Sequence, residues 1–460
     1  MAQHRDGTPF PWLLGGSLYV LSWGLNLTKP NTYFADDWFF LFGVPKAHMN
    51  DYFVETGLPP WRAVIDRELI EVGPWTLRVL TFAMMFAAAW FAFHLVQSVG
   101  VLQSQELRLF AVVFLVLPTF AARISLSMFG YTTSWFLFLG AWWLVTRLKS
   151  WRACVVALPL FVWSFMTHSL LIFIVVPVAH LLWLGFKEPQ GGRRRLLFGM
   201  SATLALLPVL YLWARSVWWA PLPEWVGYHQ PTREGFVRGS IPILLSLAAL
   251  GCLLWRTRRR RPSAFERSVA LTASGSLLFF LGLFPYMLNR SSYHRWVDVF
   301  ALNSDWGNRN QLLAPLGAAL LVVGMASVVR RPAVGWLLVA GFVGLNMFTS
   351  VQFLLDSIKR DQIREIFRTD LVAHLDGKQI VVIDTTKRFN GKGSTYRDRD
   401  IQGLASQAGI VGLEVVKGQA CSAGVVPQLM YIESEQSFIR AALMLDPQVS
   451  IRLVDCPVSE

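Results

Sequence analysis

Long apolar segments separated by short basic ones constrain this chain more than any other feature. A helix that crosses a membrane needs about 20 mostly apolar residues. The chain has 460 residues, of which 54% are hydrophobic and 15% are charged, whereas a soluble domain carries roughly 25% charged residues. We therefore predict an all-α polytopic membrane protein with about eleven transmembrane helices. Their predicted ranges are 8–27, 75–98, 107–123, 128–146, 153–167, 169–186, 196–216, 239–255, 268–288, 311–329 and 333–355.

The basic residues indicate how the chain is threaded. A net charge of +13 could suggest nucleic acid, but the cations gather in short loops, as in loops that stay in the cytoplasm. The basic clusters lie at 147–152, 187–195, 256–261 and 330–331. Successive clusters are separated by two predicted crossings. We therefore place the N-terminus inside, interpret the first span as a retained anchor, and expect membrane lipids rather than nucleic acid as partners.

Residues 153–186 form one apolar stretch that is too long for a single crossing. As one helix it would extend about 50 Å at 1.5 Å per residue, whereas the hydrocarbon core is about 30 Å thick. The polar triplet Thr167-His168-Ser169 interrupts the stretch. We predict a break there between two short spans, which also preserves the two-crossing spacing of the basic loops.

The composition changes near residue 356, and we divide the chain there. Residues 1–355 form the predicted transmembrane domain, and residues 356–460 form a small α/β domain that an odd number of crossings places outside the cytoplasm. A charged amphipathic helix is predicted at 358–375, and strands at 379–384, 413–416 and 449–454. Cys421 and Cys456 are the two cysteines of this domain, and they predict a disulfide; two free buried thiols are the alternative.

Two adjacent acids, Asp36 and Asp37, follow the first span within Tyr33-Phe34-Ala35-Asp36-Asp37-Trp38. They open an outer loop at 28–74, in which 44–54 and 61–70 have the spacing of helices lying in the membrane interface. Neighbouring carboxylates repel, so one of them tends to have a raised pKa and to suit a general base. The pair could also bind a divalent cation such as Mg²⁺ or Mn²⁺. The simpler alternative is that these acids keep the loop in water.

Most other polar residues that need an explanation belong to the same predicted outer face. They are Arg123, Tyr131, His168, Arg290, His294, Arg295 and Arg309. Arginine guanidinium groups can hold a phosphate through paired donors, although snorkelling to lipid headgroups is their ordinary role. A carboxylate base combined with a cationic clamp suits transfer of a sugar from a lipid phosphate.

This arrangement resembles the GT-C superfamily of integral membrane glycosyltransferases, and within it the bacterial O-antigen glucosyltransferases. The Asp36-Asp37 motif is similar to their Asp-Asp signature, and Asn308-Arg309-Asn310-Gln311 is similar to their late Arg motif. The resemblance implies a polyprenyl-phosphate sugar donor, a glycan acceptor and inverting transfer outside the cytoplasm of a bacterial inner membrane. It also implies a base at Asp36 or Asp37, a phosphate clamp at Arg309 with Arg290 or Arg295, and a cleft lined by residues such as Arg123, Tyr131, His168 and His294.

Three other interpretations stay open. A lipid-carrier-dependent glycan polymerase or ligase would depend mainly on outer-loop Arg and His, so loss of Asp36-Asp37 would be tolerated. A transporter or flippase would carry ionisable residues and broken helices near the midplane, whereas most predicted spans here are apolar inside. A non-catalytic assembly factor would need only a partner surface.

Overall fold

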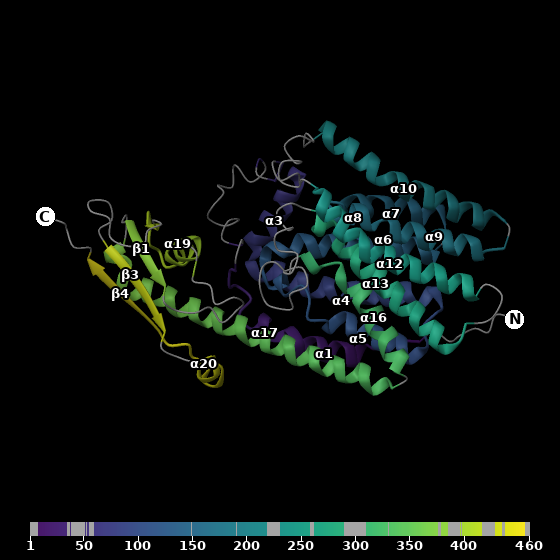
Figure 1. Ribbon diagram of the computed structural model, residues 1–460. Helices are drawn as coiled ribbons and strands as arrows, with labels where there is room; N and C mark the ends of the chain where they lie inside the picture. Colours follow the sequence, from purple (N-terminus) through teal and green to yellow (C-terminus); the bar gives the residue numbers. More distant parts are fainter. Residues whose placement is uncertain are drawn as a thin grey trace.

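The structure is a computed structural model of the chain. It describes residues 8–34, 37, 51, 53–54, 59–148, 150–189, 191–218, 231–257, 262–288, 310–329, 331–375, 379–384, 396, 398–415, 428–434 and 438–455. Within these ranges a helical bundle is followed by a small sheet domain (Figure 1). The prediction of a mostly α-helical membrane protein with a small C-terminal sheet is confirmed.

The bundle is built from helices that coincide with the predicted spans. In chain order they are α1 (Trp12–Trp23), α4 (Pro74–Val99), α5 (Ser104–Val116), α6 (Phe129–Leu148), α7 (Trp151–Ser164), α8 (Ser169–Phe173), α9 (Val175–Lys187), α10 (Gly192–Trp218), α12 (Arg233–Thr257), α13 (Ala264–Leu288), α16 (Ala314–Val329) and α17 (Pro332–Ile366). The predicted break at Thr167-His168-Ser169 lies where α7 has ended and α8 begins. Outside the bundle, α3 (Pro60–Val72) belongs to the predicted outer loop.

The predicted number of crossings is not supported. Among the described residues, six helices are long and apolar enough to cross a membrane: Pro74–Val99, Ser169–Lys187, Gly192–Trp218, Arg233–Thr257, Ala264–Leu288 and Ala333–Leu371. Other predicted spans form shorter helices. The helix α5 has 13 residues and stops before Pro118, because a proline disfavours helical geometry in the residue that precedes it.

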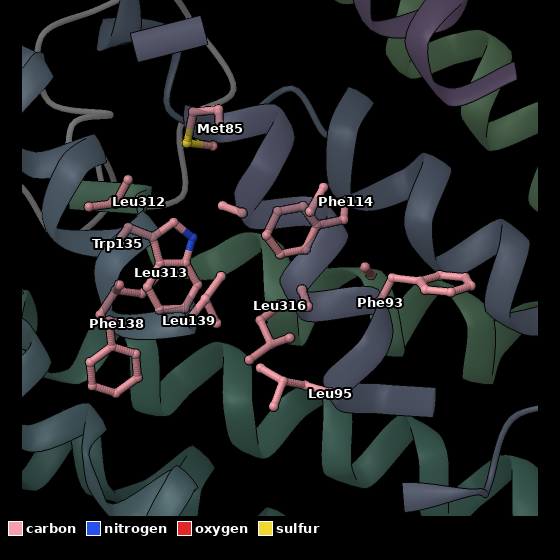
Figure 2. Packing of buried hydrophobic residues seen from close by; sticks show 14 of the residues in the cluster. Met85, Phe93, Leu95, Phe114, Trp135, Phe138, Leu139, Leu312, Leu313 and Leu316 are labelled. Atoms are coloured by element: carbon pink, nitrogen blue, oxygen red, sulfur yellow. The ribbon is translucent and has the colours of Figure 1, made fainter. Parts of the chain in front are cut away.

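The apolar core lies where α4, α5, α6 and the start of α16 meet. Trp135 and Phe138 from α6 face Leu312, Leu313 and neighbouring side chains (Figure 2). The side chains of Trp135, Phe138 and Leu313 are fully buried. Close packing of this kind holds helices together in a membrane, where lipid removes most of the hydrophobic driving force between them.

The helices α13 and α16 approach each other closely, and glycines make this contact possible. A Cβ atom on Gly317 would lie 2.1 Å from the backbone nitrogen of Phe279, and one on Gly275 would lie 2.4 Å from that of Leu321. The same holds at Gly324, where the nearest atom would be Thr272 N at 2.6 Å. Backbones that approach this closely leave no room for a side chain.

Different parts of the chain meet at the two ends of the bundle. Thr8, the first described residue, donates from Oγ1 to Ser104 Oγ at 2.8 Å, and Glu106 accepts from both Arg267 and Ser327. These contacts bring the residues before α1 and the start of α5 together with residues that adjoin the basic segments 256–261 and 330–331. The C-terminal domain lies at the other end, where α17 leaves the bundle (Figure 1).

The helix α17 joins the two parts of the chain without a break. It has 35 residues, so it extends about 52 Å at 1.5 Å per residue. The sequence suggested a span at 333–355 and a separate helix from 358, but one helix includes both. It continues through a π-helical turn, Phe367–Leu371, into α18, Val372–Leu375.

The C-terminal domain contains a four-stranded sheet in the order β2-β1-β3-β4. The strands are β1 (Gln379–Asp384), β2 (Glu414–Val415), β3 (Gln428–Ser434) and β4 (Val449–Asp455). Strand β1 is parallel to β2 and β3, and β4 is antiparallel to β3. The helix α19 (Asp398–Gln407) packs on the sheet, and α20 (Phe438–Met444) links β3 to β4. Strand β3 was not predicted from the sequence.

A buried ion pair fixes the domain to α17. Arg360 donates from Nη1 to Asp400 Oδ1 of α19 at 3.1 Å, and both side chains are almost fully buried. The guanidinium group also lies over the rings of Phe34 and Tyr396, at 5.3 and 5.0 Å. The same arginine therefore contacts Phe34, in the segment that follows α1, and the C-terminal domain.

Breaking this pair on one side should loosen the domain. We expect Asp400→Ala to cost about 3–5 kcal/mol, because it removes the hydrogen-bonded partner of a buried guanidinium group. Limited proteolysis should then cleave between α17 and α19 far faster than in the native protein. The double variant Arg360→Met with Asp400→Leu should regain protection. Equal protease resistance of Asp400→Ala and the native protein would contradict the assignment of this pair as the anchor.

Candidate functional site

Asp37 is a buried carboxylate that is held by the protein backbone. Only 1% of the residue is exposed. Its Oδ2 accepts from the Phe34 N–H at 2.8 Å, and its Oδ1 accepts from the Ser127 N–H at 3.0 Å and from the Ser125 hydroxyl. Both carboxylate oxygens are therefore engaged. The side chain joins the loop after α1 to the segment between α5 and α6.

The pKa of the Asp37 carboxyl is raised above its usual value. Burial is the main cause, because it penalises the charged form; the hydrogen bonds from Ser125, Phe34 and Ser127 lower the pKa in part. A raised pKa suits a base, but a base also needs access to its substrate. Since Asp37 is enclosed and engaged by several donors, it fits a positioning role better.

Arg78 is a second buried charged residue in the same region. It lies in the second turn of α4, is 1% exposed, and donates to three backbone carbonyls. Its Nε donates to Ile124 at 3.0 Å, Nη1 to Lys29 at 2.8 Å, and Nη2 to Thr32 at 2.5 Å. A charged side chain within an apolar helix is a candidate functional residue, and the sequence analysis missed this one. Here it holds the outer loop against the α5–α6 connection.

That connection, residues 117–128, is the centre of the candidate site. It consists of two short 3₁₀ turns, Ala121–Ile124 and Leu126–Met128, and its side chains are nearly all buried. Phe120 adopts a left-handed backbone conformation with φ of 56°, which is uncommon for a bulky residue and concentrates at functional sites. We call residues 117–128 the connector.

Two side chains hold the strained residue of the connector. The Phe120 N–H donates to Gln311 Oε1 at 3.3 Å, and the Phe120 carbonyl accepts from Arg123 Nε at 2.9 Å. Arg123 is itself buried and lies over the Trp23 ring at 4.3 Å. Arg123, expected in the cleft, thus braces the connector against α1. Gln311 belongs to the late motif Asn308-Arg309-Asn310-Gln311.

The connector therefore brings two distant motifs together. Asp37 of the Asp-Asp motif binds it at Ser125 and Ser127, and Gln311 of the late Arg motif binds it at Phe120. These contacts place Asp37 and Gln311 at the same end of the bundle. That end is also where α17 passes into the C-terminal domain, because Phe34 packs against Phe353 with ring centroids 5.3 Å apart.

His168 forms a polar contact away from the connector, with Arg215. It precedes α8, and its Nε2 accepts from Arg215 Nη1 at 2.8 Å. Arg215 lies in the last turn of α10 and is buried. Next to His168, the hydroxyls of Ser169 and Tyr286 are 3.0 Å apart. Arg215 was not singled out in the sequence, although a lone arginine near the end of an apolar helix could have indicated it.

The remaining expected site residues are placed as follows. Tyr131 lies in the first turn of α6, is half-buried, and packs against the apolar core. Asp36, Arg290, His294, Arg295 and Arg309 lie outside the described residues, as do Cys421 and Cys456 of the predicted disulfide.

Asp37 does not fit as a ligand for Mg²⁺ or Mn²⁺. Both of its oxygens face N–H and O–H donors, whereas a hard cation needs oxygen ligands. Within the described ranges, no group of three or more His, Cys, Asp and Glu side chains is arranged to hold a metal.

Comparison with known proteins adds no identification. No protein-family model matches the chain, and no curated protein matches it significantly. The resemblance to GT-C enzymes therefore depends on the two motifs and on their order along the chain.

Proposed function

We propose that this protein is a membrane glycosyltransferase of the GT-C type. It moves a monosaccharide from a polyprenyl-phosphate donor to a glycan acceptor on the non-cytoplasmic face of a bacterial inner membrane. The observation that carries the proposal is the shared attachment of Asp37 and Gln311 to the connector. A base and a phosphate clamp must meet at one place. Asp37 follows Asp36 directly in the sequence, and Gln311 is two residues after Arg309.

Because both carboxylate oxygens of Asp37 accept hydrogen bonds from the protein, we assign different roles to Asp37 and Asp36. Asp37 positions the loop by binding Ser125, Ser127 and the Phe34 N–H. Asp36 then acts as the general base. It takes the proton from an acceptor hydroxyl while that oxygen bonds to the anomeric carbon.

The leaving group requires a cation. As the new bond forms, the bond between the anomeric carbon and the phosphate oxygen breaks, and the polyprenyl phosphate departs with the electron pair. Arg309, with Arg290 or Arg295, stabilises the charge that develops on this phosphate. Attack from the face opposite the phosphate inverts the anomeric centre.

Release of polyprenyl phosphate tests this function directly. Membranes that supply the native acceptor are given synthetic polyprenyl-phosphate hexoses, and free polyprenyl phosphate is quantified. We expect Asp36→Asn to lower the rate by about 10²–10⁴-fold, which is the usual contribution of a general base. Arg309→Ala should raise the donor KM. Arg195→Ala, in the exposed first turn of α10 at the other end of the bundle, is the control and should be neutral.

Two results would contradict the proposal. Full activity of the double variant Asp36→Asn with Asp37→Asn, combined with loss of activity at Arg295 or His294, would indicate a glycan polymerase or ligase. Movement of a lipid-linked sugar across the membrane without any release of polyprenyl phosphate would indicate a flippase.

A further inference from the structure

The short helix α20 presents apolar side chains that the protein does not cover. Leu443 is 82% exposed and Ile439 is 71% exposed, and Met444 and Leu445 are more than half exposed. Large apolar residues that lie together on a surface usually mark a contact with another surface. We call these four apolar residues the α20 patch.

The position of α20 along α17 is fixed by hydrogen bonds. Gln362 of α17 donates from Nε2 to Asp446 Oδ1 at 2.7 Å, just after α20. The Val449 N–H donates to Gln362 Oε1 at 3.3 Å. The neighbouring Asp361 pairs with Lys29 at 2.7 Å, and Lys29 follows the helical segment that ends at Leu27. The α20 patch is therefore attached at the level where the first helix leaves the bundle.

Its attachment point also lies on the lipid-facing side of α17. Each residue of an α-helix turns by about 100°. Gln362 is consequently within about 20° of Leu337 and about 40° of Phe348 around the helix axis. Those two side chains are 73% and 51% exposed, as expected of residues that face lipid. Leu355, at the same angle as Leu337 but nearer to Gln362, is buried, so protein covers this side of α17 from that level onward. Figure 1 shows α20 on the side of α17 opposite α19.

We propose that the α20 patch inserts into the lipid interface next to the outer end of α17. A short helix with exposed apolar residues binds there through its apolar face. This contact continues the lipid-facing surface of α17 into the C-terminal domain. It holds the domain to the membrane at a second point besides α17. The inference depends on α17 crossing the membrane and not on the catalytic proposal.

Site-specific photo-crosslinking tests this contact in the full-length protein. The photoreactive residue p-benzoylphenylalanine replaces Leu443, and in a matched variant it replaces Val411. Val411 is similarly exposed but precedes β2, at the sheet edge farthest from β4. Both variants are illuminated in membranes that contain a clickable phosphatidylglycerol probe. Since both positions are at the surface, gel filtration should show folded protein in each case.

The expected result is a phospholipid adduct at position 443 and none at position 411. Equal lipid adducts at both positions would overturn the proposal, because they would report non-specific collision with lipid. A crosslinked dimer at position 443 without a lipid adduct would also overturn it, since the patch would then be an interface between two copies of the chain.

Discussion

Asp37→Ala is expected to destabilise the folded protein, whereas Asp36→Asn is expected to leave its stability unchanged. The Ala substitution removes the acceptor for the Phe34 N–H, the Ser127 N–H and the Ser125 hydroxyl. An unsatisfied buried donor costs about 1–3 kcal/mol, so the total loss should reach about 3 kcal/mol or more. Thermal unfolding in detergent, followed by tryptophan fluorescence, measures this loss.

The variants Asp36→Asn and Asp37→Ala should also differ in how their loss of activity relates to their stability. Asp36→Asn should unfold at the native temperature and yet release almost no polyprenyl phosphate. Asp37→Ala should lose activity together with stability, and measurements well below its unfolding temperature should recover part of the rate. If Asp37→Ala were as stable as the native protein, its structural role would be wrong. If Asp36→Asn were the less stable of the two, the assignment of roles would be reversed.

Gly317→Ala is expected to push α13 and α16 apart. The added methyl group would lie 2.1 Å from Phe279 N and 2.5 Å from its Cα. These are backbone atoms, so no rotamer change can relieve the overlap. Overpacking typically costs about 1–3 kcal/mol, and Gly317→Leu should exceed that range and abolish accumulation of folded protein. The fraction of protein that remains monodisperse after heating in detergent reports the effect.

Gly251→Ala is the matched control for this contact. Gly251 lies in α12 and is exposed, and a methyl group added to its Cα would have no neighbouring atom within 4 Å. Alanine favours a helix over glycine by about 1 kcal/mol, so this variant should be neutral or slightly more stable. Equal stability of Gly317→Ala and Gly251→Ala would contradict the close approach of the two helices.

Local patterns predicted the elements that depend on local sequence. The strand at 379–384 coincides with β1, and the strand at 449–454 differs from β4 by a single residue. The break at Thr167-His168-Ser169 was predictable from length alone, because hydrocarbon thickness limits a span. Strand β3, Gln428–Ser434, was missed although its apolar run Leu429 to Ile432 is typical of a buried strand.

Long-range contacts explain what the sequence could not predict. The charges at Asp356, Lys359 and Arg360 suggested that the span had ended, yet all three are buried. Arg360 is compensated by Asp400, 40 residues away, so α17 continues unbroken through this charged stretch. The role of Asp37 likewise depends on Ser125 and Ser127, at separations of 88 and 90 residues.

The candidate site was located in part. The sequence identified the Asp-Asp motif and the late Arg motif, and the structure attaches Asp37 and Gln311 to the connector. The connector itself was overlooked, because residues 117–123 were assigned to a span. Tertiary contacts with Asp37, Arg78 and Gln311 hold that segment in a form other than an α-helix.

Because α17 continues without a break into the C-terminal domain, the position of that domain depends on how far α17 tilts within the bilayer. A rod of 35 residues, about 52 Å long, displaces its tip by about 9 Å when it leans by about 10°. A small rearrangement among the membrane helices, such as one that admits a bulky lipid, would thus shift the sheet by a large, easily measured distance. A fluorophore on the sheet and another at the N-terminal end of the bundle would detect that motion.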